Sequence, residues 1–142
     1  MALQYSVAVR NARLDAVETA VIGSGSPLKQ AMLELRSGEQ PSNCAAADTG
    51  TLLAQIILPN DFMAAASGGT KAINGTWTGT GAGTGTIAHF RVKEMGSPDV
   101  VHMQGSVGLS GSPTYDMTVD NVSVTPGQAI TVSTFTITAG NA

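Results

Sequence analysis

The run from Gln128 to Ala142, Q-A-I-T-V-S-T-F-T-I-T-A-G-N-A, is the longest segment of the chain with a β-strand pattern. Ile130 and Val132 alternate with small polar residues, and the alternation resumes at Phe135 and Ile137. A period of two with β-branched and aromatic residues is typical of a half-buried strand. The alternation slips once, between Val132 and Phe135. A β-bulge there would keep all four large side chains on one face, so we predict a bulged, central strand.

Short strands are also predicted for most of the chain before this run. Apolar segments alternate with Gly, Pro, Asn and Asp, which favour turns. Together with the final run, the predicted strands are Met32–Ser37, Thr51–Leu58, Lys71–Thr78, Thr86–Lys93, Val100–Leu109, Tyr115–Val119 and Val122–Val124. About eight short strands of this kind predict an all-β sandwich or barrel. There is no repeat of fixed period, so a propeller or solenoid is not expected.

Two local details extend this prediction. In the strand Met32–Ser37 we expect Leu33 and Leu35 to face the core, and the side chains of Met32, Glu34 and Arg36 to lie on a more solvated face. After Pro59, Asn60 could cap a single helical turn over Asp61–Ala66.

One helix is predicted, over Ser6–Val21. Its apolar stripe follows the helical period, its charged residues lie on other faces, and Gly23 and Pro27 would end it. The stripe consists of Val7, Leu14, Val17 and Val21. We therefore divide the chain into an N-terminal arm, helix and connection, residues 1–27, and a β domain, residues 28–142.

Charge and cysteine content exclude several classes of function. Charged residues are only 12% of the chain and the net charge is -3, which does not favour direct nucleic-acid binding. All seven basic residues lie at or before Lys93. No apolar run is long enough for a membrane span, and no signal peptide is expected. The single cysteine, Cys44, cannot form a disulfide within the chain.

The sequence gives only a weak signal for a metal site. His89 and His102, on neighbouring predicted strands, could bind a metal with Glu94 or Asp99, but the spacing of a ligand set is missing and two edge histidines are favoured. Three further residues with side-chain oxygens lie close together in the sequence, Asp116, Asp120 and Asn121. We interpret them as turn residues, and a calcium site is the alternative.

Other motifs favour structural roles. The loop Gly79–Gly85 matches no phosphate-binding pattern and precedes no helix, so a flexible hairpin loop is preferred. Cys44 has no basic neighbour in sequence that would activate a thiolate. Asn74 and Asn121 match the glycosylation pattern, and we interpret these as chance matches. Trp77 is the only tryptophan, and a lone tryptophan in a strand is more often core than a sugar-stacking platform.

Three stretches together carry a resemblance to a known class of proteins. They are M-A-L-Q-Y-S-V-A-V-R-N-A-R-L-D-A-V-E, S-G-E-Q-P-S-N-C-A-A-A-D-T-G-T-L-L-A-Q-I-I-L-P and D-M-T-V-D-N-V-S-V-T-P-G-Q-A-I-T-V-S-T-F-T-I-T-A-G-N-A. The chain resembles the capsid cement, or decoration, proteins of tailed bacteriophages over most of its length. The resemblance implies a jelly-roll β-sandwich of about eight antiparallel strands with one N-terminal helix.

The resemblance also implies a structural function without catalysis. Such a protein, made in the host cytoplasm, binds the outside of the capsid in the virion, bridges neighbouring major capsid proteins and often forms dimers or trimers. It needs no cofactor and no metal, and it contacts neither nucleic acid nor membrane. The helix and arm are the elements that a β core needs least, so partner binding is expected at Leu3, Tyr5, Arg10 and Arg13.

Two other functions compete with this prediction. One is a different virion-associated or glycan-binding jelly roll, in which Trp77 would contact the sugar. The other is a cupin-like metal enzyme, built on His89 and His102.

Overall fold

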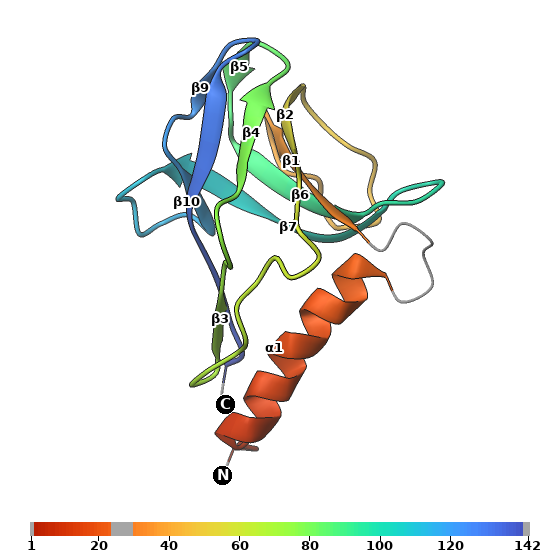
Figure 1. Cartoon of the computed structure of the whole chain (residues 1–142), viewed down its shortest axis with the longest axis vertical. Coiled ribbons are helices and arrows are strands. Elements are labelled where there is room, and N and C mark those ends of the chain that lie inside the picture. The colour runs from red at the N-terminus through yellow and green to blue at the C-terminus, as the bar shows by residue number, and fades with distance from the viewer. Residues whose placement is uncertain (1, 24–29, 141–142) are drawn as a thin grey trace.

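The computed structural model describes residues 2–23 and 30–140, which form one helix and a set of short β-strands (Figure 1). This confirms the prediction of a mostly β domain with an N-terminal helix. The elements in chain order are α1 (Val7–Ile22), β1 (Ala31–Arg36), β2 (Leu52–Ile57), β3 (Thr70–Ala72), β4 (Thr78–Gly81), β5 (Gly85–Thr86), β6 (His89–Glu94), β7 (Val100–Leu109), β8 (Met117–Val119), β9 (Ser123–Val124) and β10 (Ala129–Thr138).

The main sheet closes on itself. Its strand order is β3-β10-β4-β2-β1-β6-β7-β8, and β8 pairs with β10 as well as with β7. Seven strands therefore form a barrel-like ring, from β10 through β4, β2, β1, β6 and β7 to β8. Strand β3 pairs with the C-terminal part of β10, on the same edge of β10 as β4. Strands β5 and β9 form a separate two-stranded ribbon. A ring of this kind leaves few open sheet edges.

One pair of neighbouring strands is parallel, which corrects the prediction of antiparallel strands throughout. Val107, Gly108 and Leu109 of β7 lie beside Met117, Thr118 and Val119 of β8 in parallel register. Parallel neighbours usually need a crossover of a dozen or more residues. Here residues 110–116 make the connection, and within it the ring of Tyr115 packs against Gly108, where a Cβ would lie 2.0 Å from its Cδ2 atom.

Strand β10 behaves as its sequence predicts. The register against β8 shifts between Val132 and Thr134, so the bulge lies where the alternation slips. Ile130, Val132 and Phe135 are buried, and Ile137 packs half-buried against the same core. The strand is also central, because β3, β4 and β8 all pair with it.

Aromatic rings line the interior next to β10. The ring of Trp77 packs against Phe62 and Phe135, with centroids 5.8 Å apart in both pairs, and Phe90 meets Phe135 edge-on at 5.4 Å. The indole N–H of Trp77 donates to the carbonyl oxygen of Phe62 at 3.1 Å. Burying a ring together with its polar atom requires such a partner. Trp77 is therefore a core residue.

Two segment predictions are wrong in detail. Asp61–Ala66 forms no helical turn. Residues 60–61 form a turn, and Met63 then makes an antiparallel bridge with Ile73. The predicted strand Lys71–Thr78 is split, because β3 ends at Ala72 and β4 begins at Thr78. In both places, contacts between residues distant in sequence override the local pattern.

Helix α1 matches its prediction to within a residue at each end. Ser6 caps it by accepting a hydrogen bond from the Val9 N–H at 3.3 Å. Gly23, with φ 81°, ends it and donates its N–H to the Thr19 carbonyl. The predicted connection beyond Gly23, including Pro27, lies outside the described residues, as do Met1 and residues 141–142. No helix among the described residues is long and apolar enough to span a membrane.

Candidate partner-binding site

The N-terminal arm and the start of α1 carry an exposed apolar surface. Leu3 is 68% exposed, and three further large hydrophobic residues, Tyr5, Val7 and Val9, follow it at 40–50% exposure. Val7 was expected to continue the buried stripe of the helix, and this is wrong, because burial along α1 begins only at Leu14. We call Leu3, Tyr5, Val7 and Val9 the N-terminal apolar surface. Clustered exposed apolar residues of this kind often mark an interaction site.

The two predicted arginine contacts differ. The guanidinium of Arg13 lies over the Tyr5 ring, 5.2 Å from its centroid, and its side chain is exposed. Arg10 instead faces the barrel, where its Nε donates to the Ala139 carbonyl at 2.8 Å. The guanidinium of Arg10 also occupies the position that a Cβ on Gly69 would need. Leu3, Tyr5 and Arg13 are therefore exposed at the surface, whereas Arg10 fixes the helix to the end of β10.

A polar stripe on α1 continues this attachment. Three side chains of the helix accept hydrogen bonds from backbone N–H groups of the segment before β3. Asn11 accepts from Gly69 at 2.8 Å. The donor to Asp15 is Ala66 at 3.0 Å, and the donor to Glu18 is Met63 at 2.9 Å. Side-chain acceptors thereby satisfy backbone groups that no strand pairs. The helix is held by specific contacts to the segment 63–69.

Lys71 of β3 lies at the centre of this contact. Its buried Nζ is 2.8 Å from Asp15 Oδ1 and 3.1 Å from Glu18 Oε2. Burial opposes the charged ammonium, but the hydrogen bonds that it donates to Asp15 and Glu18 outweigh this effect and raise the pKa of Lys71. The hydrogen bond from Lys71 in turn lowers the pKa of Asp15. We call Asp15, Glu18 and Lys71 the helix clamp.

A second charged cluster holds the long loop 37–51 against the outside of β1 and β6. Asp48 on the loop pairs with Arg91 and, at 2.7 Å, with Lys93. Glu34 on β1 pairs with Lys93 at 3.0 Å and with Arg36 at 2.8 Å. Burial opposes ionisation of Asp48, but hydrogen bonds from Lys93 and Arg91 outweigh it and lower its pKa. We call these five residues the loop clamp.

The loop clamp corrects the expected solvated face of the first strand. Glu34 is only 4% exposed, because the loop covers it. The second guanidinium nitrogen of Arg91 donates to the carbonyl oxygens of Cys44 at 2.9 Å and Ala46 at 3.0 Å. Buried charges are tolerated when they are paired and hydrogen-bonded in this way. The clamp also fixes the position of Cys44.

The histidines do not form a common site. The Nδ1 atom of buried His89 lies 3.0 Å from the Gly38 carbonyl oxygen. Burial, together with nearby Arg36 and Arg91, lowers the pKa of His89. The Nε2 atom of His102 instead pairs with Glu94 at 2.9 Å. Among the described residues no group of three or more His, Cys, Asp or Glu side chains could hold a metal.

The candidate calcium ligands are occupied by backbone groups. Asp116 accepts from the Ser106 N–H and hydroxyl, Asp120 accepts from the Thr131 N–H at 2.9 Å, and Asn121 accepts from the Ser123 N–H at 2.9 Å. Only the bond of Asn121 is a local turn contact, whereas Asp116 and Asp120 each join residues about ten positions apart in the chain. Most of the segment Gly79–Gly85 is in strands, and a Cβ on Gly81 would lie 2.3 Å from the Thr125 carbonyl oxygen. Its glycines therefore allow close packing.

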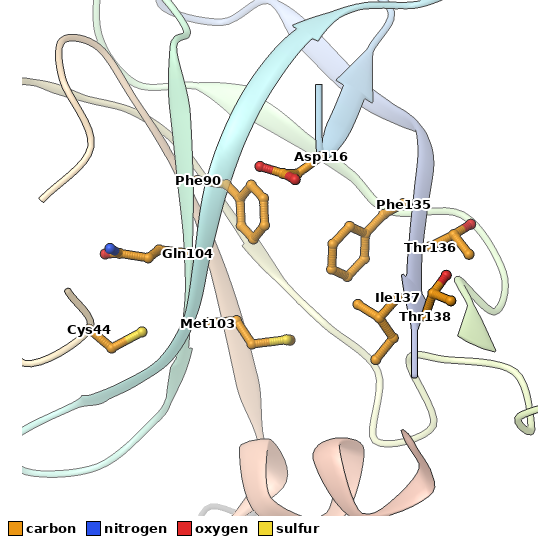
Figure 2. Close-up of a pocket in the computed structure, with 9 residues that line it drawn as sticks. All are labelled: Cys44, Phe90, Met103, Gln104, Asp116, Phe135, Thr136, Ile137 and Thr138. Atoms are coloured by element: carbon orange, nitrogen blue, oxygen red, sulfur yellow. The ribbon is translucent and has the colours of Figure 1, made fainter. Parts of the chain in front are cut away.

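A cavity of about 440 Å³ opens between β7 and the C-terminal part of β10 (Figure 2). Met103 of β7 and Ile137 of β10 face it from opposite sides, and the rings of Phe90 and Phe135 lie deeper between the two strands. Asp116, Cys44 and the polar residues of β10 complete the wall. Its volume and largely apolar lining are within the range of binding pockets in proteins. No sequence signal pointed to this cavity, because its walls come from segments far apart in the chain.

Comparison with known proteins finds no family model, no curated protein and no solved structure that matches this chain.

Proposed function

We propose that this chain is a structural, non-enzymatic virion protein of the cement type. It binds the outside of a tailed-phage capsid, bridges neighbouring major capsid proteins and thereby stabilises the shell. A jelly-roll relationship of the β domain, and assembly of the protein as a dimer or trimer on the capsid, belong to the same proposal. The proposal starts from the resemblance described above.

The N-terminal apolar surface is the observation that supports the proposal most directly. Val7 and Val9 lie in the first turn of a helix that the helix clamp holds to the barrel, and Leu3 and Tyr5 lie in the arm directly before it. A rigid support lowers the entropy cost of presenting such residues to a partner. Binding to the assembled shell stabilises it by mass action, and many weak contacts on one lattice add avidity.

The glycan-binding alternative gains no support. It depended on a tryptophan ring at the surface, and Trp77 is 1% exposed with its indole N–H bonded to Phe62. Stacking against a sugar requires an accessible ring face.

Capsid co-sedimentation tests the proposal. The purified protein is mixed with capsids that lack it, and bound protein and capsid melting temperature are measured. We expect binding that raises the capsid melting temperature, and loss of both effects in Val7→Ser/Val9→Ser, which alters the exposed start of α1 and leaves the arm unchanged. The matched control is Leu109→Ser, because Leu109 is 51% exposed on another part of the surface. Failure of the unaltered protein to bind would refute the proposed function.

A further inference from the structure

The cavity between β7 and β10 has two unpaired strand edges. Strand β8 bridges these strands only through Met117–Val119, which pair with Val107–Leu109 on one side and with β10 up to Phe135 on the other. Before Val107, β7 pairs only with β6 among the described residues. After Phe135, residues 136–138 of β10 pair only with β3 in the same part of the chain. The barrel wall therefore lacks a strand in line with β8.

The backbone of β10 presents hydrogen-bonding groups to this space. Ala139 donates its N–H to the Gly69 carbonyl at 3.0 Å, on the β3 side. In an antiparallel pair every second residue directs its backbone N–H and C=O groups toward the partner strand. Ile137, two residues before Ala139 and opposite Lys71, therefore also directs these groups toward β3. The N–H and C=O groups of Thr136 and Thr138 consequently point to the other edge, toward the cavity. An extended segment laid there can pair with them as a strand added to the sheet.

The cavity also suits the side chains of such a segment. A strand in the barrel wall directs every second side chain inward. Inward-facing residues there would meet Met103, Ile137 and the two phenylalanine rings (Figure 2). The occupant is therefore expected to be an extended segment with large apolar residues two apart.

The chain itself contains a segment with these properties. The arm before α1 has no secondary structure, and the backbone of Ser6 at its end is extended, with ψ 159°. Leu3 and Tyr5 are two residues apart and exposed. Four extended residues span about 13 Å, enough to cover three strand positions.

The arm also starts near the cavity. Arg10, one turn into the helix, bonds to Ala139 just after β10, and both ends of the described chain lie at the same end of the molecule (Figure 1). Two copies that face each other through this end can exchange their arms symmetrically, with each arm entering the cavity of the other copy. Such isologous exchange is a common and low-cost route to dimers.

We propose that the arm Ala2–Tyr5 of one copy inserts as an additional strand between β7 and β10 of a second copy. Leu3 enters the apolar cavity, and the backbone of the arm pairs with the free edge of Thr136 and Thr138. The inference concerns contacts between copies of this chain and stands independently of the capsid.

Oligomeric state in the absence of capsids is the first test. Sedimentation equilibrium of the full chain should show a dimer that Leu3→Asp converts to monomer, whereas Leu109→Asp leaves it dimeric. Thr138→Pro should also give monomer, because proline removes an N–H that no strand among the described residues uses. Circular dichroism confirms that each variant is folded. A monomer at all accessible concentrations, or a dimer that tolerates Thr138→Pro, overturns the inference.

Disulfide trapping identifies the occupant. Cys44, the only cysteine of the chain, lines the cavity. Cys44 and Gln104 lie on the side of β7 opposite to Met103 (Figure 2), so the outward-facing neighbour of Leu3 is the position to trap. Under mild oxidation Gln4→Cys should give a covalent dimer linked through residues 4 and 44, which peptide mass spectrometry identifies, and Leu109→Cys should not link to Cys44. A 4–44 bond within one chain means that the arm enters its own cavity and overturns the exchange. Protection of Cys44 only when capsids are added assigns the cavity to a capsid segment and also overturns it. Neither result depends on whether the protein stabilises capsids.

Discussion

Asp116 holds Ser106 through two hydrogen bonds to one carboxylate oxygen, from the backbone N–H and from the hydroxyl, both 2.8 Å long. The pair joins the start of β8 to the middle of β7. It fixes the short return that makes these two strands parallel and closes the ring.

Removing this carboxylate should weaken the closure of the barrel. We expect Asp116→Ala to lower the free energy of unfolding by about 1–3 kcal/mol, because the Ser106 N–H loses its charged acceptor. Urea denaturation measures the change. The control is Glu39→Ala, since Glu39 is exposed and its carboxylate has no partner among the described residues. A loss no larger than in the control would mean that the pair contributes nothing to stability.

A methyl group at Gly108 should disturb the same return. Its Cβ would lie 2.0 Å from the Tyr115 ring, so the ring has to move. We expect Gly108→Ala to cost about 1–3 kcal/mol in thermal or urea unfolding, as overpacking does. Gly140→Ala is the matched control, because nothing lies within 4 Å of the added Cβ there. The cost should shrink in a Tyr115→Ala background, and an unchanged cost would contradict the assigned contact.

His89 should make stability depend on pH below neutrality. Its pKa in the folded state is lowered from 6.5 by burial, so the unfolded chain binds a proton that the folded chain does not. Well above pH 6.5 the contribution of His89 to the free energy of unfolding should be constant, because His89 is then neutral in both states. It should fall as pH decreases from 6.5 toward the folded-state pKa. Urea titrations between pH 5 and about 8 measure the slope.

The variant His89→Asn separates this contribution from others. It can keep the bond to the Gly38 carbonyl without a titrating group, so the contribution of His89 to the slope should disappear. The control is a second substitution, His102→Asn, which leaves His89 in place and should retain this contribution. An unchanged slope in His89→Asn would refute the prediction.

The helix clamp should control how firmly α1 is held. Glu18→Ala removes the acceptor of the Met63 N–H and one partner of Lys71, which should cost about 1–3 kcal/mol. Amide hydrogen exchange should accelerate across α1 more than in β1 and β6. Thr19→Ala, at an exposed neighbouring position, serves as control. Uniform acceleration through the whole chain would instead mean that helix and barrel unfold as one unit.

Local patterns predicted the elements well where the deciding interactions lie within one segment. The slip between Val132 and Phe135 located the bulge, because only an extra residue keeps these side chains on one face. Ser6 and Gly23 bounded the helix through capping chemistry that involves only neighbouring residues. Neither required knowledge of the rest of the fold.

Contacts between distant segments were beyond such patterns. Glu34 is polar and alternates with leucines, which indicates a solvated position, yet the loop 37–51 covers it, and Asp48 of that loop shares Lys93 with Glu34. The connection between the parallel strands brings Tyr115 against Gly108, a contact that no periodicity encodes. The cavity has walls from β7, β10 and the loop carrying Cys44, so no single stretch of sequence could reveal it.

The pairing of β10 with three other strands also constrains folding during synthesis. A ribosome-bound chain that stops before β10 can form only an open sheet, from β4 through β2, β1, β6 and β7 to β8, with two unpaired edges. Unpaired edges associate with other chains. The risk of aggregation therefore depends on how soon the ten residues of β10 emerge and seal both edges at once.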